Sequence, residues 1–437
     1  MPLLGCGRWA ELRAVVAFAP LFVFSLACAE LVATPTQALP PIPGLREIGA
    51  KDLVTLQEVE EAVVRLRGLK FKKSMRYHSI DRAGLQEFFV SELDRQNPED
   101  SLAGEEKALV AFGCLGPDQS FRQLLLDLVG EQAAGFYEDE RKCLVLASGL
   151  PLNIGLSRTI LAHEMTHALQ DQHFGLQKLG LKDLGNDDRR IARLSLVEGD
   201  ATHLMAQYQI EYVGLGLVLD MVLTQFMSQE KFYASPPYLQ RTLVFPYIHG
   251  DAFIRALQDR GGWSAVNAAY HDPPDSTEQI IHPEKYFPKR DTPTEITFPP
   301  LRGTLGVTWQ PVRENVMGEL GIAVVLERFI DPDRAADAAS GWDGDRYVVF
   351  ERPADGHLLV AWKLAFDTDT DAAQFLDACR QMFKVRFETT PVRSTEVGTT
   401  VLSYKKGLVH LRQTGTSMVA VWGPKRKARQ VFAALSD

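Results

Sequence analysis

Cysteine is scarce in this 437-residue chain, and no long run of lysine and arginine occurs in it. Five cysteines are present, and the spacing of Cys114, Cys143 and Cys379 fits no zinc knuckle. The formal net charge is -9, so the sequence lacks the basic surface that binding to nucleic acid requires. We therefore expect no nucleic-acid partner.

Because Cys114, Cys143 and Cys379 are three in number, at least one of these thiols stays unpaired. An exported protein can form disulfides, and Cys114 with Cys143 is then the favoured pair because both residues lie in the first domain. The alternative, which we prefer, is that all three are buried small residues with a packing role.

The N-terminal apolar run is too short to cross a bilayer. Arg8 and Arg13 precede this run, residues 14–27, which has the length of a signal-peptide core. Small residues around Cys28 provide a cleavage site. We expect residues 1–29 to be a signal peptide and the mature protein to be exported, either periplasmic or secreted. The alternative is lipidation of Cys28, which would attach the protein to a membrane.

A second apolar stretch, Gly214–Met227, is short and carries Asp220 and Gln225. A membrane-spanning helix needs about 20 predominantly apolar residues. We therefore expect this stretch to form a buried or interfacial helix.

The spacing of apolar residues changes at the Pro299-Pro300 pair, which we interpret as a domain boundary. After a linker at 30–48, residues 49–299 show mainly helical spacing, with one β-hairpin near residues 134–147. Residues 301–437 alternate between strands and helices. The predicted fold class is α+β: a mainly helical domain with a small β-hairpin or edge sheet, followed by a smaller α+β domain of unknown role.

Individual elements follow from the same patterns. Ser157 is a suitable N-cap and Gly175 a suitable C-terminal stop for a long helix. Further helices are expected at about 188–213, 371–383 and 424–435, and strands at 143–147, 346–351, 357–366, 400–412 and 417–422.

The long helix contains the segment His163-Glu164-Met165-Thr166-His167, which matches the pattern HExxH. Residues four apart lie on one face of a helix, so His163 and His167 can bind the same metal ion. Zinc lowers the pKa of a bound water to about 7, and Glu164 is placed to accept its proton as a general base. The alternative is a structural helix whose two histidines have other partners.

A catalytic zinc ion needs a third protein ligand, and two residues are candidates. His173 has the histidine spacing of HExxHxxGxxH, but Gln170 stands where that motif has its turn-forming glycine. Glu198 lies within the apolar stripe of the following helix, where an unpaired carboxylate is costly to bury. We predict Glu198 as the ligand; the alternative is a core glutamate paired with Arg190 or Arg193.

The HExxH segment with Glu198 resembles the gluzincin class of zincin metallopeptidases. His163–Phe174, Leu196–Ala201 and Ser276–Tyr286 also resemble a little-characterised group of exported bacterial and archaeal zincin-like proteins, over roughly residues 125–290. The resemblance implies one zinc ion on His163, His167 and Glu198, with Glu164 as the base. It also implies a peptide or protein substrate in extended form along an edge strand, here expected at Cys143–Ala147.

One position departs from the gluzincin pattern. Thr202 stands four residues after Glu198, where many gluzincins carry an aspartate that supports a metal-bound histidine. Asp171 and Asp200 are the candidates to replace it.

Peptide hydrolysis builds negative charge on the carbonyl oxygen, so a hydrogen-bond donor beyond the zinc is expected. We predict His282 for this catalytic role, with Tyr286, Tyr247 and His249 as alternatives. The expected activity is that of a zinc metallopeptidase, taken as an endopeptidase. A catalytically inactive binding or envelope-assembly module and a zinc amidase acting on a non-protein substrate are the alternatives. The sequence does not indicate an oligomeric state.

Overall fold

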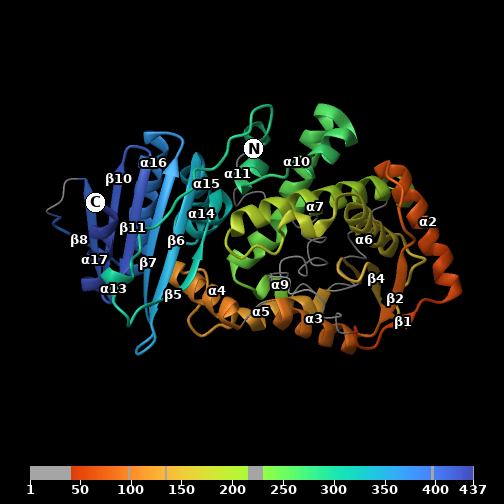
Figure 1. Ribbon diagram of the computed structural model, residues 1–437, viewed down its shortest axis with the longest axis horizontal. Helices are drawn as coiled ribbons and strands as arrows, with labels where there is room; N and C mark the ends of the chain where they lie inside the picture. Colours follow the sequence, from red (N-terminus) through yellow and green to blue (C-terminus); the bar gives the residue numbers. More distant parts are fainter. Residues whose placement is uncertain (1–40, 97–98, 133–134, 215–229, 395–397, 437) are drawn as a thin grey trace.

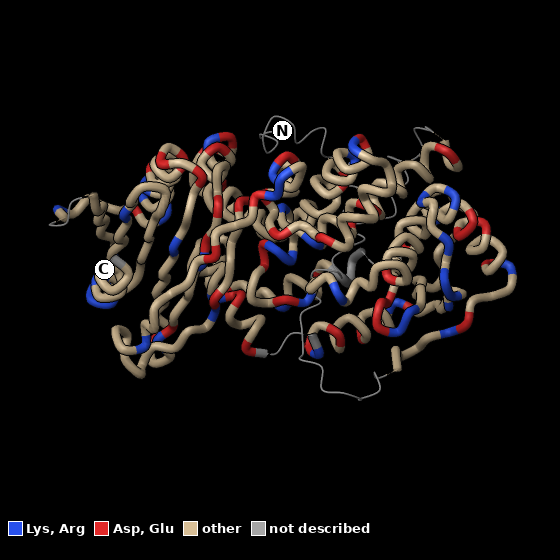
Figure 2. Tube along the Cα trace, turned by 45° about the horizontal axis from the view of Figure 1, so that its top comes forward, with Lys and Arg blue, Asp and Glu red and all other residues tan. Residues whose placement is uncertain are grey.

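The computed structural model describes residues 41–96, 99–132, 135–214, 230–394 and 398–436. It contains two β-sheets, which lie at opposite ends of the molecule with helices between them (Figure 1). This arrangement confirms the predicted α+β class. Acidic and basic residues are interspersed along both halves of the chain (Figure 2).

The N-terminal part is mainly helical. It comprises β1 (Arg46–Glu47), α2 (Ala50–Arg67), β2 (Arg76–Ile80), α3 (Arg82–Gln96), α4 (Glu99–Phe112), α5 (Phe121–Gln132), β3 (Gly135–Glu138), β4 (Cys143–Ala147), α6 (Gly155–Phe174), η3 (Leu176–Leu179), α7 (Asp187–Tyr208), η4 (Gln209–Val213), α9 (Glu230–Ala234), α10 (Pro237–Ala269), α11 (Thr277–Ile281) and α12 (Pro283–Tyr286).

The small sheet of this part has the strand order β1-β2-β4-β3. Strands β3 and β4 form the predicted antiparallel hairpin, with Tyr137 opposite Leu144. Strand β2 runs parallel to β4, and β1 falls inside the segment that the sequence predicts as a linker. Because β4 lies between β2 and β3, the prediction that Cys143–Ala147 is an edge strand is wrong. Among the described strands, β3 is the terminal one on this side.

Helices α6, α7 and α10 form the centre of the molecule (Figure 1). Helix α6 begins at Gly155 rather than at Ser157, and it ends before Gly175, whose φ of 73° is the left-handed conformation expected of a C-terminal glycine. Helix α7 begins after Asn186, whose side chain accepts a hydrogen bond from the backbone N–H of Arg189. Both helices therefore lie close to their predicted positions.

The C-terminal part is built on a seven-stranded antiparallel sheet with the order β5-β6-β7-β11-β10-β9-β8. Its elements are α13 (Arg302–Leu305), β5 (Gln310–Asn315), α14 (Gly318–Glu327), α15 (Pro332–Ala339), β6 (Trp342–Arg352), β7 (His357–Phe366), α16 (Asp369–Phe387), β8 (Thr390–Val392), β9 (Thr399–Tyr404), β10 (Gly407–Thr414), β11 (Ser417–Gly423) and α17 (Lys425–Ser436).

One predicted strand of this part, 400–412, is in fact two strands. Strands β9 and β10 are antiparallel and are joined by a tight turn at Lys405 and Lys406. Neither lysine is a strong turn-forming residue. The strand-like pattern therefore continues through the turn, and the sequence does not mark it.

The hydrophobic core is continuous across the predicted domain boundary. Phe112, from α4 in the N-terminal part, packs edge-on against Tyr347, Trp362 and Trp422 of the large sheet, with ring centroids 5.1–5.3 Å apart. Helix α14 packs in turn against α7 and α10. The two parts therefore share one hydrophobic core and do not have separate cores at this boundary.

The three cysteines of the described residues, Cys114, Cys143 and Cys379, are buried and unpaired. The preferred interpretation as packing residues is thus confirmed, and Cys114 and Cys143 form no disulfide. No helix within the described ranges has the length and apolar character needed to cross a membrane. The predicted signal peptide and nearly all of the apolar stretch Gly214–Met227 lie outside the described residues.

Candidate metal centre

Helix α6 presents His163 and His167 on one buried face. The two residues are one turn apart, and their ring centroids are 4.7 Å from each other. The Nε2 atom of His167 lies 3.0 Å from the Nε2 atom of His163. His163 is completely buried and His167 nearly so. The HExxH segment therefore directs two imidazole nitrogens at one point inside the protein.

Helix α7 brings Glu198 to the same point. An oxygen of Glu198 lies 3.2 Å from Nε2 of His163 and 3.4 Å from Nε2 of His167. The stripe around Glu198 is buried as the spacing predicts, through Leu194, Val197, Ala201, Leu204 and Met205. The alternative partners are engaged elsewhere, since Arg190 pairs with Asp187 and Arg193 with Asp275.

His173 lies away from this cluster. Helix α6 continues through Gln170 and Asp171, so no turn swings His173 back toward His167. Its Nε2–H donates instead to the carbonyl oxygen of Lys70, at 2.8 Å. Glu198, and not His173, therefore lies beside the two histidines of the HExxH segment.

The donor set fits a zinc ion. Two imidazoles and one carboxylate form a common ligand set of catalytic zinc sites. Zinc–ligand distances of about 2.0–2.1 Å in a tetrahedron place neighbouring ligand atoms about 3.3–3.4 Å apart. The three edges of the triangle between His163, His167 and Glu198 measure 3.0, 3.2 and 3.4 Å. Among the described residues, this is the one group of three potential ligands with such close spacing.

Burial and neighbouring charges act together on the pKa values of the three residues of the triangle. Burial lowers the pKa of His163 to about 4, which keeps this imidazole neutral. Burial opposes charge on His167 as well, but the Glu198 carboxylate raises the pKa of His167 to about 9. The two imidazoles in turn hold the pKa of Glu198 below its ordinary value despite burial. A divalent cation would therefore replace the proton on His167 as the partner of Glu198.

Glu164 lies beside the triangle and is held by strand β3. Its carboxylate accepts a hydrogen bond from the backbone N–H of Tyr137, at 2.9 Å. Burial raises the pKa of Glu164 to about 7, although the nearby His167 favours the charged form. Because the N–H of Tyr137 points toward α6, the open edge of β3 faces the candidate site.

The candidate donors for the carbonyl oxygen lie at different places. Tyr247, on α10, is buried, and its ring centroid is 6.2 Å from that of His163. His282, between α11 and α12, contacts Glu319 at 3.0 Å and Glu284 at 3.8 Å. Hydrogen bonding to Glu319 raises the pKa of His282. The shorter of these two contacts thus joins His282 to α14 of the C-terminal part, and its catalytic role stays a prediction.

The two aspartates considered as supports for the histidines have other partners. Asp171 accepts hydrogen bonds from the hydroxyl of Tyr137 and from Lys142. Asp200 accepts two from Arg67, at 2.9 and 3.1 Å, and one from Tyr270. Neither makes one of the hydrogen bonds recorded at the imidazoles.

Two contacts of the site follow from the fold and not from a motif. The side chain of Gln170 reaches Nδ1 of His167, and the backbone of Tyr137 reaches Glu164. The three-residue spacing between His167 and Gln170 is a signal that could have indicated the first contact. The second depends on the pairing of distant segments, so no local pattern reveals it.

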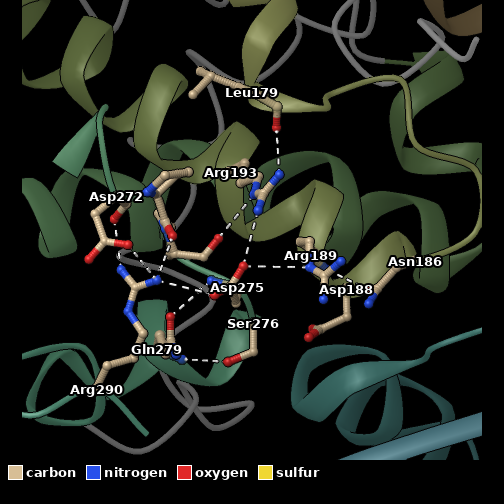
Figure 3. A network of polar contacts seen from close by, with 12 residues as sticks. Leu179, Asn186, Asp188, Arg189, Arg193, Asp272, Asp275, Ser276, Gln279 and Arg290 are labelled. Atoms are coloured by element: carbon tan, nitrogen blue, oxygen red, sulfur yellow. Dashed lines mark hydrogen bonds and ion pairs between the residues drawn. The ribbon is translucent and has the colours of Figure 1, made fainter. Parts of the chain in front are cut away.

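The segment that precedes α11 is fixed to α7 by a charged network. The Asp275 carboxylate forms ion pairs with Arg193 at 3.0 Å, Arg290 at 3.1 Å and Arg189 at 3.5 Å (Figure 3). The backbone N–H of Asp275 donates to the side chain of Gln279. The segment that precedes α11 is therefore joined to α7 at Arg189 and Arg193.

Comparison with known protein families gives one match. Residues 307–432 match the model of a domain of unknown function (DUF8575), which covers most of the C-terminal part and none of the metal centre. The match begins close to the predicted start of the second domain at residue 301. No curated protein and no solved structure matches the chain.

Proposed function

We propose that the protein is a zinc-dependent hydrolase that cleaves peptide bonds. The observation that carries the proposal is the buried triangle of His163, His167 and Glu198 with Glu164 beside it. A structural histidine pair would not need a buried carboxylate at 3.2 and 3.4 Å from both rings. Peptides are the proposed substrates because the open edge of strand β3 faces this cluster and can pair with an extended chain.

A zinc ion bound there would act as a Lewis acid on the scissile carbonyl and on an attacking water. Glu164 accepts the proton of that water and returns it to the leaving amine. Burial raises the pKa of the Glu164 carboxyl and thus favours uptake of this proton. The N–H of Tyr137 orients the carboxylate, and Tyr247 is the better-placed donor for the developing oxyanion, since His282 is bound to Glu319.

We further propose that the mature protein acts outside the cytoplasm, as the N-terminal segment predicts. Mass spectrometry of the mature chain after expression in a bacterial host tests this point. An N-terminus at Glu30 supports simple cleavage, and a lipidated Cys28 would show instead that the protein is membrane-attached.

Metal analysis of the purified mature protein, paired with digestion of a broad peptide library, tests the activity. We expect one zinc ion per chain and cleavage that Glu164→Gln reduces by at least about 100-fold while zinc is retained. Glu61→Gln, an exposed glutamate on α2, is the matched control and should leave both unchanged.

Each other result has a defined meaning. Full cleavage by Glu164→Gln would contradict the proposed mechanism. Zinc without cleavage of any peptide would favour a binding module or an amidase with a non-protein substrate, and absence of zinc would reject the metal centre.

A further inference from the structure

We propose that Gln170 is a positioning residue of the metal centre. The inference rests on the zinc site proposed above. The buried amide of Gln170 determines which nitrogen of His167 faces the metal. The same amide holds helix α6 against helix α7 beside Glu198.

The orientation of the Gln170 amide follows from its partners. Its Nε2–H donates to the backbone carbonyl of Val197, at 2.9 Å. A carbonyl oxygen only accepts, so the amide nitrogen must face Val197, and the amide oxygen must face His167. That oxygen lies 2.9 Å from Nδ1 of His167. Because the amide oxygen also only accepts, Nδ1 of His167 carries a hydrogen.

This hydrogen bond selects the nitrogen that can bind metal. With Nδ1 protonated, the lone pair of a neutral His167 imidazole is on Nε2. Nε2 is the atom that lies 3.0 Å from Nε2 of His163 and 3.4 Å from the Glu198 carboxylate. Gln170 therefore sets the tautomer that the triangle requires, the role that carboxylates fill at many zinc sites.

The second hydrogen bond acts on the other ligand helix. Val197 immediately precedes Glu198 in α7, so the bond to its carbonyl ties the backbone beside one ligand to the side chain that holds another. Gln170 is completely buried, so bulk water does not reach the amide to replace either partner. Loss of the amide leaves a buried donor on His167 unsatisfied.

The experiment uses the full mature chain and two variants. Gln170→Leu removes both hydrogen bonds at similar volume, whereas Gln170→Glu keeps an acceptor for His167 and loses the donor to Val197. Gln172→Leu is the matched control, because Gln172 is on the same helix and bonds only with the backbone of Lys72 and Lys73 among its recorded partners. Zinc Kd is measured by competition with a chromophoric chelator, and circular dichroism checks folding.

We expect Gln170→Leu to weaken zinc binding about 10- to 100-fold. Gln170→Glu should weaken it less, and Gln172→Leu should not change it. The ¹⁵N NMR spectrum of the zinc-loaded wild-type protein should show a hydrogen on Nδ1 of His167, which a residue with only a structural role would not determine.

The outcomes separate this inference from the proposed function. Absence of zinc in the wild-type protein would reject the metal centre itself. Wild-type zinc binding with an unchanged Kd in folded Gln170→Leu, or with an equal loss in both variants, would overturn the role of Gln170 alone. If Gln170→Leu does not fold, the wild-type spectrum decides, and a hydrogen on Nε2 of His167 would overturn the inference.

Discussion

Helices α7 and α10 cross at a contact between two glycines, and Gly199→Ala tests how far the metal centre depends on it. Gly199 directly follows Glu198. A Cβ atom added at Gly199 would lie 2.2 Å from the carbonyl carbon and 2.4 Å from the carbonyl oxygen of Gly250. A Cβ at Gly250 would meet the carbonyl oxygen of Ser195 at 2.3 Å. The helix that approaches Gly199 this closely is therefore α10.

The expected magnitude follows from these distances. Ordinary contacts begin at 3.4 Å, so α7 and α10 must separate by about 1 Å, and backbone atoms cannot rotate away as a side chain can. Overpacking of this kind costs up to about 3 kcal/mol. Alanine recovers about 1 kcal/mol through its higher helix propensity. We therefore expect Gly199→Ala to lower the free energy of unfolding by about 2 kcal/mol.

Zinc binding should respond more strongly than stability. Metal ligands must be held within about 0.5 Å of their working positions, and Glu198 is carried by the displaced backbone. We expect zinc Kd to rise by more than about tenfold. Urea unfolding in the presence of a chelator measures stability, and chelator competition measures zinc Kd.

Gly303→Ala is the control for this experiment. A Cβ at Gly303, in α13, meets no atom within 4 Å, so its substitution should leave both quantities unchanged. If Gly199→Ala unfolds within about 0.5 kcal/mol of the wild-type protein, α7 and α10 do not pack as closely as the structure has them, and the reasoning is refuted.

Three further predictions concern the ligands and the interface between the two parts. Glu198→Ala should lose most bound zinc, whereas His173→Ala should keep it; metal analysis that gave the reverse would make His173, and not Glu198, the third ligand. Gly318→Ala should destabilise the fold by more than about 1 kcal/mol, because its φ is 71° and its Cβ would meet the Asp188 carboxylate at 1.8 Å; an unchanged thermal midpoint would contradict this. Burial raises the pKa of Asp188 to about 7, so between about pH 4 and 7 the folded protein holds a proton that the unfolded chain releases, and this contribution to stability falls as pH rises. Asp188→Asn should flatten that slope in urea unfolding, and an unchanged slope would reject the assignment.

The parts of the site that the sequence predicts are those set by spacing within a helix. His163, Glu164 and His167 need only the helix itself to lie on neighbouring faces. Glu198 is found because a carboxylate within an apolar stripe needs a partner. The continuation of α6 through Gln170 follows from the same local reasoning, since glutamine does not favour the turn that His173 would need.

The parts that the sequence misses depend on contacts between distant segments. Strand β4 is taken as an edge strand because only its hairpin partner is visible locally, whereas β2 pairs with it across more than sixty residues of chain. The same limit applies to Tyr137, whose role comes from its backbone N–H and not from its side chain. To identify which strand lies at the edge of a sheet, the pairing of all its strands must be known.

The C-terminal part contacts the start of α7, the helix that carries Glu198. The backbone N–H of Asp187, the first residue of α7, donates to the side chain of Asn315, and its carboxylate accepts from Arg313 and Asn315. Asp188 accepts two hydrogen bonds from Thr277, whose hydroxyl in turn accepts from the backbone of Leu320.

The start of the helix that carries Glu198 is therefore held between two segments, the one after α10 and the C-terminal part. The segment Ser276–Tyr286, in which the sequence suggested a catalytic residue, thus has a structural role. Thr277 contacts Asp188 of α7, and His282 contacts Glu319 of α14. A fixed start to α7 sets the position of the later residues along the helix axis. Glu198, the proposed zinc ligand, lies about three turns further on. The C-terminal part thus contacts the first residue of the helix that carries Glu198, and it bears on the proposed zinc site through these contacts.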